Sequence, residues 1–191
     1  MVRLFYRAWH GRGSYRDLTS LSLVTFLFGI IYGLFSFYLP IFAEDAVKNV
    51  ALVGILLAVV EIMGIIVDLP LGAFADRYGR RRTIFLGAIL LGLAALFFQF
   101  STASLIFLVL ALAFYGVVVE LVLIPEDAEM MAISPRRKSG KFFGFYEAWH
   151  NFGYAVGPFI GGFLIWYAPP PVFWVLIFLV MVIAVWVRLQ K

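Results

Sequence analysis

The sequence predicts an all-α membrane protein with six transmembrane helices, and three observations support this fold class. The 191-residue chain is 64% hydrophobic and only 14% charged, whereas soluble domains carry about a quarter charged residues. Its apolar residues form unbroken runs of about 20 residues, the length that a membrane-spanning helix needs. Lys and Arg cluster in alternate breaks between these runs. A β-barrel is excluded because its strands alternate apolar and polar residues over about ten positions.

The six predicted spans follow one another with short polar breaks. They cover residues 18–42, 50–75, 83–100, 103–124, 142–167 and 172–187. Glu44, Asp45, Lys48 and Asn49 form the first break, and a charged loop forms the second.

The later breaks differ in strength. The third contains only Ser101 and Thr102 among its polar residues and is the weakest. The fourth runs from Glu126 to Lys141, and the fifth is a run of three prolines at residues 169–171.

The six spans form one predicted bundle, residues 18–187, between two short flanking segments. Residues 1–17 have no small-residue cleavage site, so we interpret them as an interfacial segment and not as a secretory signal. In this segment Phe5, Tyr6 and Trp9 would lie at headgroup level while arginines face lipid phosphates. Residues 188–191 form a short tail.

The basic residues predict the orientation of the bundle. Fourteen of the fifteen Lys and Arg lie before the first span, between the second and third, between the fourth and fifth, or after the sixth, and only Lys48 lies elsewhere. Since cytoplasmic loops carry the excess of Lys and Arg, we expect a multi-pass protein of the plasma or inner membrane with both termini in the cytoplasm. Five or seven spans would scatter these charges over both sides.

The loop between the second and third spans reads GAFADRYGRRRT, residues 72–83. Gly72 is expected to let two helices approach closely, and Gly79 to permit a tight turn with positive φ. Asp76 should lie within reach of the neighbouring arginines and form a conformational latch with them. These arginines are Arg77, Arg80 and Arg81.

This loop resembles the signature of the major facilitator superfamily, Gly-x-Leu-x-Asp-Arg-x-Gly-Arg-Arg. Phe74 replaces the usual leucine, and the other signature positions match. An ordinary positive-inside loop would explain the arginines, but not the aspartate and two glycines at this spacing. The resemblance implies a helical membrane transporter.

The fifth span carries a second resemblance to the same family. The family pattern is met by Gly144, Gly153, Gly157, Pro158, Gly161 and Gly162. Three of these glycines recur at every fourth residue and predict a smooth strip for close helix packing, while the proline favours a bend. In the family this pattern is associated with exporters that exchange substrate for protons.

The resemblance covers the whole chain but only half of a usual family member. Family transporters have twelve helices in two six-helix halves, and each half contains a 3+3 inverted repeat. The chain is similar to the amino-terminal half. One departure concerns the fourth span, where exporters of the family often carry an arginine four residues before a glycine. Here Leu112 precedes Gly116 at that spacing.

Acidic residues inside the apolar spans are the candidates for proton or substrate binding, because such residues are costly in a membrane. Glu61 and Asp68 share one face of the second span. The fifth span carries a polar face with Glu147, His150 and Asn151. Our hypothesis is that Glu61 or the Glu147–His150 pair carries a coupling proton. The alternative is that these residues hydrogen-bond between helices and hold the bundle together.

Other acidic residues are better explained by structural roles. Glu120 is expected to bond between helices, and Glu126, Asp127 and Glu129 are expected to pair with the loop arginines.

The sequence therefore predicts a half-size secondary transporter for a small molecule, coupled to protons. A six-helix bundle alone would present its polar face to lipid, so the first expectation is a homodimer and the second a pairing with a separately encoded carboxy-terminal half. A truncated, inactive fragment is the third alternative. A non-transporting membrane subunit is the competing class.

Several other functions are excluded by missing motifs. There is no nucleophile elbow, phosphate loop or His-rich metal spacing, so we predict no enzyme activity, metal or cofactor. Nucleic-acid binding is not expected, because membrane topology explains the basic residues.

Overall fold

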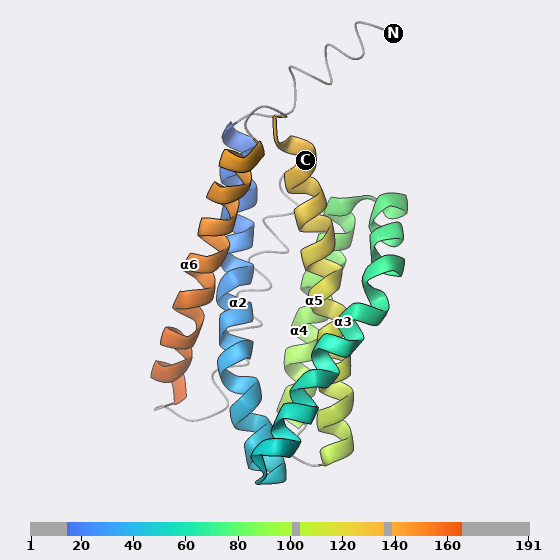
Figure 1. Cartoon of the computed structure of the whole chain (residues 1–191), viewed down its shortest axis with the longest axis vertical. Helices are drawn as coiled ribbons and strands as arrows, with labels where there is room; N and C mark the ends of the chain where they lie inside the picture. Colours follow the sequence, from blue (N-terminus) through green and yellow to red (C-terminus); the bar gives the residue numbers. More distant parts are fainter. Residues whose placement is uncertain (1–14, 101–103, 136–138, 166–191) are drawn as a thin grey trace, which may run out of the picture.

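The computed structural model describes residues 15–100, 104–135 and 139–165, which form five helices, each antiparallel to the one before it (Figure 1). The helices are α2 (Tyr15–Val47), α3 (Val50–Tyr78), α4 (Arg80–Phe100), α5 (Leu105–Ile133) and α6 (Ser139–Ile165). The predicted sixth span, the flanking segment at residues 1–14 and the tail lie outside the described residues. The six-helix count and the inverted repeat therefore stay predictions.

Four of the described helices are long and apolar enough to cross a membrane. They are α2, α3, α4 and α5, counted over the described residues. α6 is not among them, and it is the helix that carries Glu147, His150 and Asn151. The prediction of an all-helical membrane protein is confirmed.

The first helix ends later than predicted. Glu44 and Asp45 belong to the last turns of α2, and the chain turns only at Lys48, whose φ is 50°. Asp45 accepts a hydrogen bond of 2.8 Å from Lys48, while the Asn49 side chain caps α3 by accepting from the Ala51 and Leu52 amides. Polar residues here cap and pair within helix ends instead of breaking them.

The fourth predicted break is wrong in its first half, because α5 continues to Ile133. The continuation is held by packing: Met130 and Ile133 lie in a small apolar cluster with Leu18 and Leu21 of α2. A hydropathy break appears at the charged run that begins at Glu126, but the helix still has an apolar face beyond it. Burial of this apolar face stabilises the helix and offsets the cost of the charged residues on its other faces.

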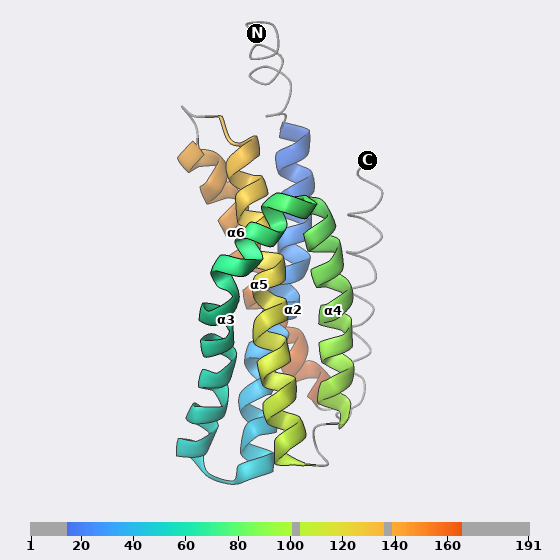
Figure 2. The same ribbon diagram turned by 90° about the vertical axis from the view of Figure 1, so that its right-hand side faces the viewer.

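The packing of the bundle joins helices that are far apart in sequence. α2 packs chiefly along α6, and α5 packs between α3 and α4 (Figures 1 and 2). The main core fills the space between α2, α4 and α5, where Leu34, Leu91 and Leu112 have no exposed surface.

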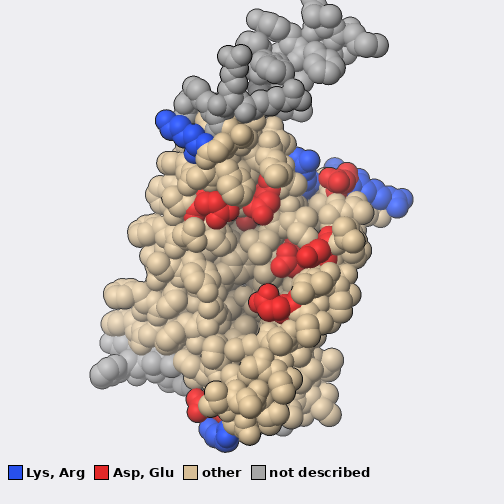
Figure 3. Space-filling model, in the orientation of Figure 1, with Lys and Arg blue, Asp and Glu red and all other residues tan. Residues whose placement is uncertain are grey.

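The described Lys and Arg side chains gather mainly at one end of the bundle, as the sequence predicts (Figure 3). The α3–α4 turn, the end of α5 and the start of α6 lie at the same end as the start of α2 (Figure 1). Figure 3 shows the described Lys and Arg side chains near this end, apart from one group at the opposite tip. Which end faces the cytoplasm stays a prediction.

Candidate functional site

The turn between α3 and α4 has the backbone geometry that the sequence predicted. Gly79 has a φ of 94°, and its amide donates a hydrogen bond of 2.9 Å to the Ala75 carbonyl at the end of α3. A residue with a side chain would be strained at this φ. The prediction for Gly79 is confirmed.

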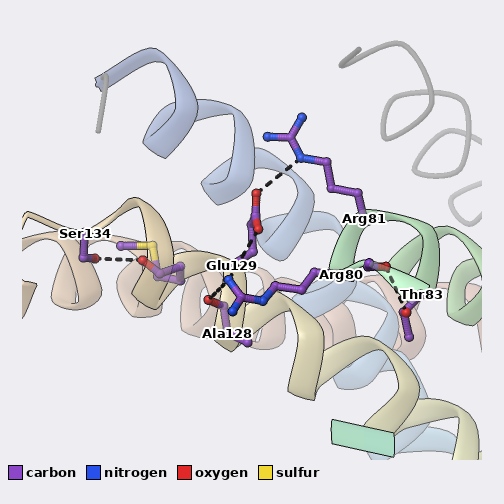
Figure 4. Close-up of polar contacts among 8 residues, drawn as sticks. Arg80, Arg81, Thr83, Ala128, Glu129 and Ser134 are labelled. Carbon is purple, nitrogen blue, oxygen red and sulfur yellow. Dashed lines mark hydrogen bonds and ion pairs between the residues drawn. The ribbon is translucent and has the colours of Figure 1, made fainter. Parts of the chain in front are cut away.

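The carboxylate that binds the loop arginines is Glu129 of α5 (Figure 4). Arg81 Nε lies 3.3 Å from Glu129 Oε1, and Arg80 Nη1 lies 3.8 Å from Glu129 Oε2. Arg80 also donates a hydrogen bond of 2.8 Å to the Ala128 carbonyl. The prediction that Glu129 pairs with the loop is confirmed.

Asp76 does not occupy the predicted position in the latch. It is exposed, and within the described ranges it makes no ion pair with an arginine. Arg77 instead lies over the Tyr78 ring, 5.6 Å from its centroid. The reason is the direction in which each residue leaves its helix. Asp76 and Arg77 point outward at the end of α3, whereas Arg80 begins α4 and faces α5.

Residues from both sides of the turn line an open pocket of about 530 Å³.

Gly72 does not mark a close helix contact in this structure. A methyl group placed on it would meet only Ile124 Cγ2, at an ordinary 4.0 Å. A close approach of α3 to α5 lies at Gly116 instead, where a methyl group would overlap the Val60 carbonyl oxygen.

The glycine strip of α6 forms the seam with α2. A methyl group on Gly157 would lie 2.6 Å from both the Ile30 oxygen and the Leu34 nitrogen. One on Gly153 would overlap the Phe26 carbonyl oxygen, and one on Gly161 would lie 2.8 Å from Phe37 Cδ1. Backbone therefore lies against backbone at Gly153 and Gly157, whereas Gly161 lies against side chains, and all three glycines are closely packed as predicted.

The other glycines of the pattern have a different environment. No described atom lies within 4 Å of a methyl group on Gly144 or Gly162. Pro158 belongs to the seam, since its Cδ would lie 2.9 Å from a methyl group on Gly33.

The sequence analysis missed the complementary strip on α2. Methyl groups on Gly29 and Gly33 would overlap the carbonyl oxygens of His150 and Tyr154. The signal was present, because these two glycines are four residues apart in an apolar helix, as in the small-residue motif of membrane helix pairs.

Carboxylates from two helices meet between α3 and α5. Glu61 and Asp68 of α3 are exposed, and the partly buried Glu120 of α5 lies over Gly64, where a methyl group would meet its Cγ and Oε1 at 3.3 Å. The face-sharing prediction for α3 is consistent with this arrangement. No described hydrogen bond ties these three carboxylates across the helices, so the interhelical bond expected for Glu120 is not observed.

A second polar group lies where α2, α5 and α6 meet. His150 Nδ1 is 3.4 Å from the Thr25 hydroxyl, and the Tyr146 hydroxyl donates a bond of 3.1 Å to Asp127. His150 interacts electrostatically with Glu147 and Asp127 but forms no ion pair with Glu147 within 4.0 Å in the described part of the chain.

The remaining residues of the α6 polar face lie further along the helix. The Tyr154 hydroxyl is 2.7 Å from that of Ser36, and Asn151 is exposed.

Glu126 is the residue whose environment differs most from the prediction. It was expected in a loop beside arginines, but it is 0% exposed and faces α2 and α6. The Thr25 hydroxyl is adjacent, yet neither carboxylate oxygen has a partner at good hydrogen-bond geometry among the described residues. Asp127 also has a different partner from the one expected, because Tyr146 and not an arginine binds it. The cause of both errors is the extra length of α5.

The sequence matches the profile of the Major Facilitator Superfamily over residues 21–191. The chain belongs to this superfamily.

The chain is similar to two curated proteins. An uncharacterized MFS-type transporter of Methanocaldococcus jannaschii is 25% identical over 142 residues, which are 74% of this chain and 36% of the relative. Quinolone resistance protein NorA of Staphylococcus aureus is 28% identical over 139 residues, which are 73% of this chain and 36% of that protein. The chain thus spans little more than a third of the length of either relative. Superfamily membership points to a transporter and not to an enzyme.

Proposed function

We propose that the chain forms one six-helix half of a secondary transporter that exports a small molecule in exchange for protons. The observation that carries this proposal is a band of acidic side chains across one face of an otherwise apolar bundle (Figure 3). Its members come from α3, α5 and α6: Glu120 interacts electrostatically with Glu61, Asp68 and Asp127, and His150 interacts with both Asp127 and Glu147. Carboxylates in membrane helices are costly, and a wet transport path is the usual reason for them.

The acidic face requires a partner that keeps it away from lipid. A second copy inserted the same way could pair about a twofold axis along the membrane normal, as the two halves of superfamily members do. This homodimer is our leading proposal, and a separate carboxy-terminal half is the second. We place the assembly in the plasma or inner membrane with both termini in the cytoplasm.

Two observations support export. The α6 glycine pattern is of the kind associated with proton-exchanging exporters, and one relative is a quinolone resistance protein. Glu61 and the Glu147–His150 pair are the proposed groups for the coupling proton. The pair is favoured because His150 is linked to a buried polar group, whereas Glu61 is exposed.

The first experiment counts chains and then measures flux. The chain is purified in mild detergent, its mass is measured under native conditions, and it is reconstituted in liposomes with an imposed proton gradient. A quinolone, a sugar and an organic acid serve as probes. A two-copy complex that moves one probe against its gradient supports the proposal.

The competing class, a non-transporting subunit, predicts a different result. It predicts a single copy bound to an unrelated protein and no flux of any probe in that complex. Such a result would overturn the transport proposal.

A further inference from the structure

The buried carboxylate of Glu126 is the most unusual polar group of the described chain. The side chain is 0% exposed, and neither of its oxygens has a hydrogen-bond partner of good geometry among the described residues. The Tyr32 and Ser22 hydroxyls on α2 are also buried, with no hydrogen-bond partner in the part of the chain that the structure describes. An ionised carboxylate in such a place is strongly disfavoured by the loss of its hydration, whereas a protonated carboxyl is neutral and can donate a hydrogen bond.

A route of polar groups connects Glu126 to the exposed acidic band. The Thr25 hydroxyl has no exposed surface and lies beside Glu126. The same hydroxyl is 3.4 Å from Nδ1 of the partly exposed His150. A second branch runs through Tyr146, which is buried and donates to the exposed Asp127 at 3.1 Å.

Groups from all three helices around Glu126 set its charge balance. From α2, α5 and α6 these are Tyr32, Asp127, Tyr146, Glu147 and His150. Only His150 can be cationic. Two of the arginines at the start of α4, Arg80 and Arg81, pair with Glu129 instead. Among the described side chains, the groups that interact with Glu126 include no arginine or lysine.

We propose that Glu126 holds the coupling proton and that Thr25 and His150 pass it to and from the acidic face. This inference rests on the proposed transport function. It identifies Glu126 as the group with which Glu147 and His150 exchange the proton. A proton taken up by His150 at the acidic face moves through the Thr25 hydroxyl, which gives its own proton to Glu126 and receives the one from His150. The carboxylate becomes a carboxyl and the imidazole becomes neutral. Release follows the same path in reverse.

The first test needs no substrate. The full chain, in the oligomeric form in which it purifies, is placed in lipid vesicles, and infrared spectra are recorded over a pH titration. We expect a carbonyl band of a buried protonated carboxyl that Glu126→Gln removes and Glu120→Gln leaves in place. If the Glu126→Gln protein keeps every titrating carboxyl band of the wild type, the proposal is wrong.

Thr25→Val provides a second variant with the shape of the original side chain but without its hydroxyl, for use if Glu126→Gln does not fold. We expect the carboxyl band to remain, with a displaced pH midpoint and slower exchange of its proton for deuterium. An unchanged midpoint and exchange rate would overturn the role of Thr25.

Flux separates this inference from the proposed function. In liposomes with a probe that the wild type transports, Glu126→Gln should lose uphill transport driven by the proton gradient and keep exchange of labelled for unlabelled probe. Uphill transport by Glu126→Gln together with its loss in Glu61→Gln would overturn the assignment to Glu126. A wild type without flux would contradict the transport proposal, while the infrared result would still decide the protonation of Glu126.

Discussion

The two long helix seams of the bundle are built in different ways. Along α2–α6 the backbones touch at successive turns, with glycines on both helices: Gly29, Gly33, Gly153 and Gly157. Along α3–α5 the backbones meet at Gly116, and elsewhere side chains such as Glu120 and Ile124 separate them. In α2 72% of the apolar stretch is buried, and in α3 only 17%.

The difference indicates which contact is fixed and which can adjust. A backbone contact repeated at successive turns allows only one alignment of the two helices. Each glycine leaves room only for the backbone atom that lies opposite it. A seam of side chains can change by rotamer shifts. We therefore expect α2 and α6 to move as one unit, and α3 to change its position against α5 when the transporter changes state.

The largest expected effect comes from Gly157→Ala in the α2–α6 seam. The added methyl group would lie 2.6 Å from two backbone atoms of α2 that cannot move independently. Overpacking of this kind costs about 1–3 kcal/mol. The variant should show a clear drop in thermal midpoint in detergent, measured by size-exclusion of heated samples. Gly144→Ala on the same helix, with open space around it, is the matched control. Equal midpoints for the two variants would refute a fixed seam.

A smaller effect is expected from the hydrogen bond between α2 and α6 further along the same seam. Tyr154→Phe removes the 2.7 Å bond to Ser36, and a bond of this type contributes about 0.5–1.5 kcal/mol. A double-mutant cycle with Ser36→Ala should give a coupling free energy in that range. No coupling between the two sites would show that the glycine contacts alone hold the helices together.

The latch between α4 and α5 should contribute less to stability. Glu129→Gln removes the charge that Arg80 and Arg81 share, and ion pairs at a surface contribute about 0–1 kcal/mol. The loss should shrink at high salt, which screens the pairs in the wild type. Asp76→Asn is the control and should change the thermal midpoint less at low salt. A larger effect of Asp76→Asn would restore the latch that the sequence predicted.

The smallest effect on stability is expected from Gly72→Ala in α3. Its nearest neighbour across the seam is 4.0 Å away, and alanine is favoured over glycine in a helix by about 1 kcal/mol. The thermal midpoint should stay equal or rise slightly. Reduced flux in this stable variant would show that Gly72 is closely packed in another state of the transport cycle, whereas a lower midpoint would show that α3–α5 is as tightly fitted as α2–α6.

The sequence predicted the helices, the turn at Gly79 and the close packing of α6 because each depends on local residue type. It predicted that Glu129 pairs with the loop arginines, but it wrongly placed Asp76 in the same latch, since the position of Asp76 depends on the rotation of the last turn of α3 relative to α5. Glu126 was misplaced for a related reason: a run of charges was interpreted as the end of a helix. Whether a carboxylate is buried depends on helices that lie about a hundred residues apart in the chain.

The sequence separation across the α2–α6 seam has a consequence for biosynthesis. Thr25 and His150 are 125 residues apart, and ribosomes add about 5–20 residues per second. The glycine groove of α2 must therefore wait roughly 6–25 s for the helix that fills it. During this interval the small-residue face of α2 has no α6 against which to pack.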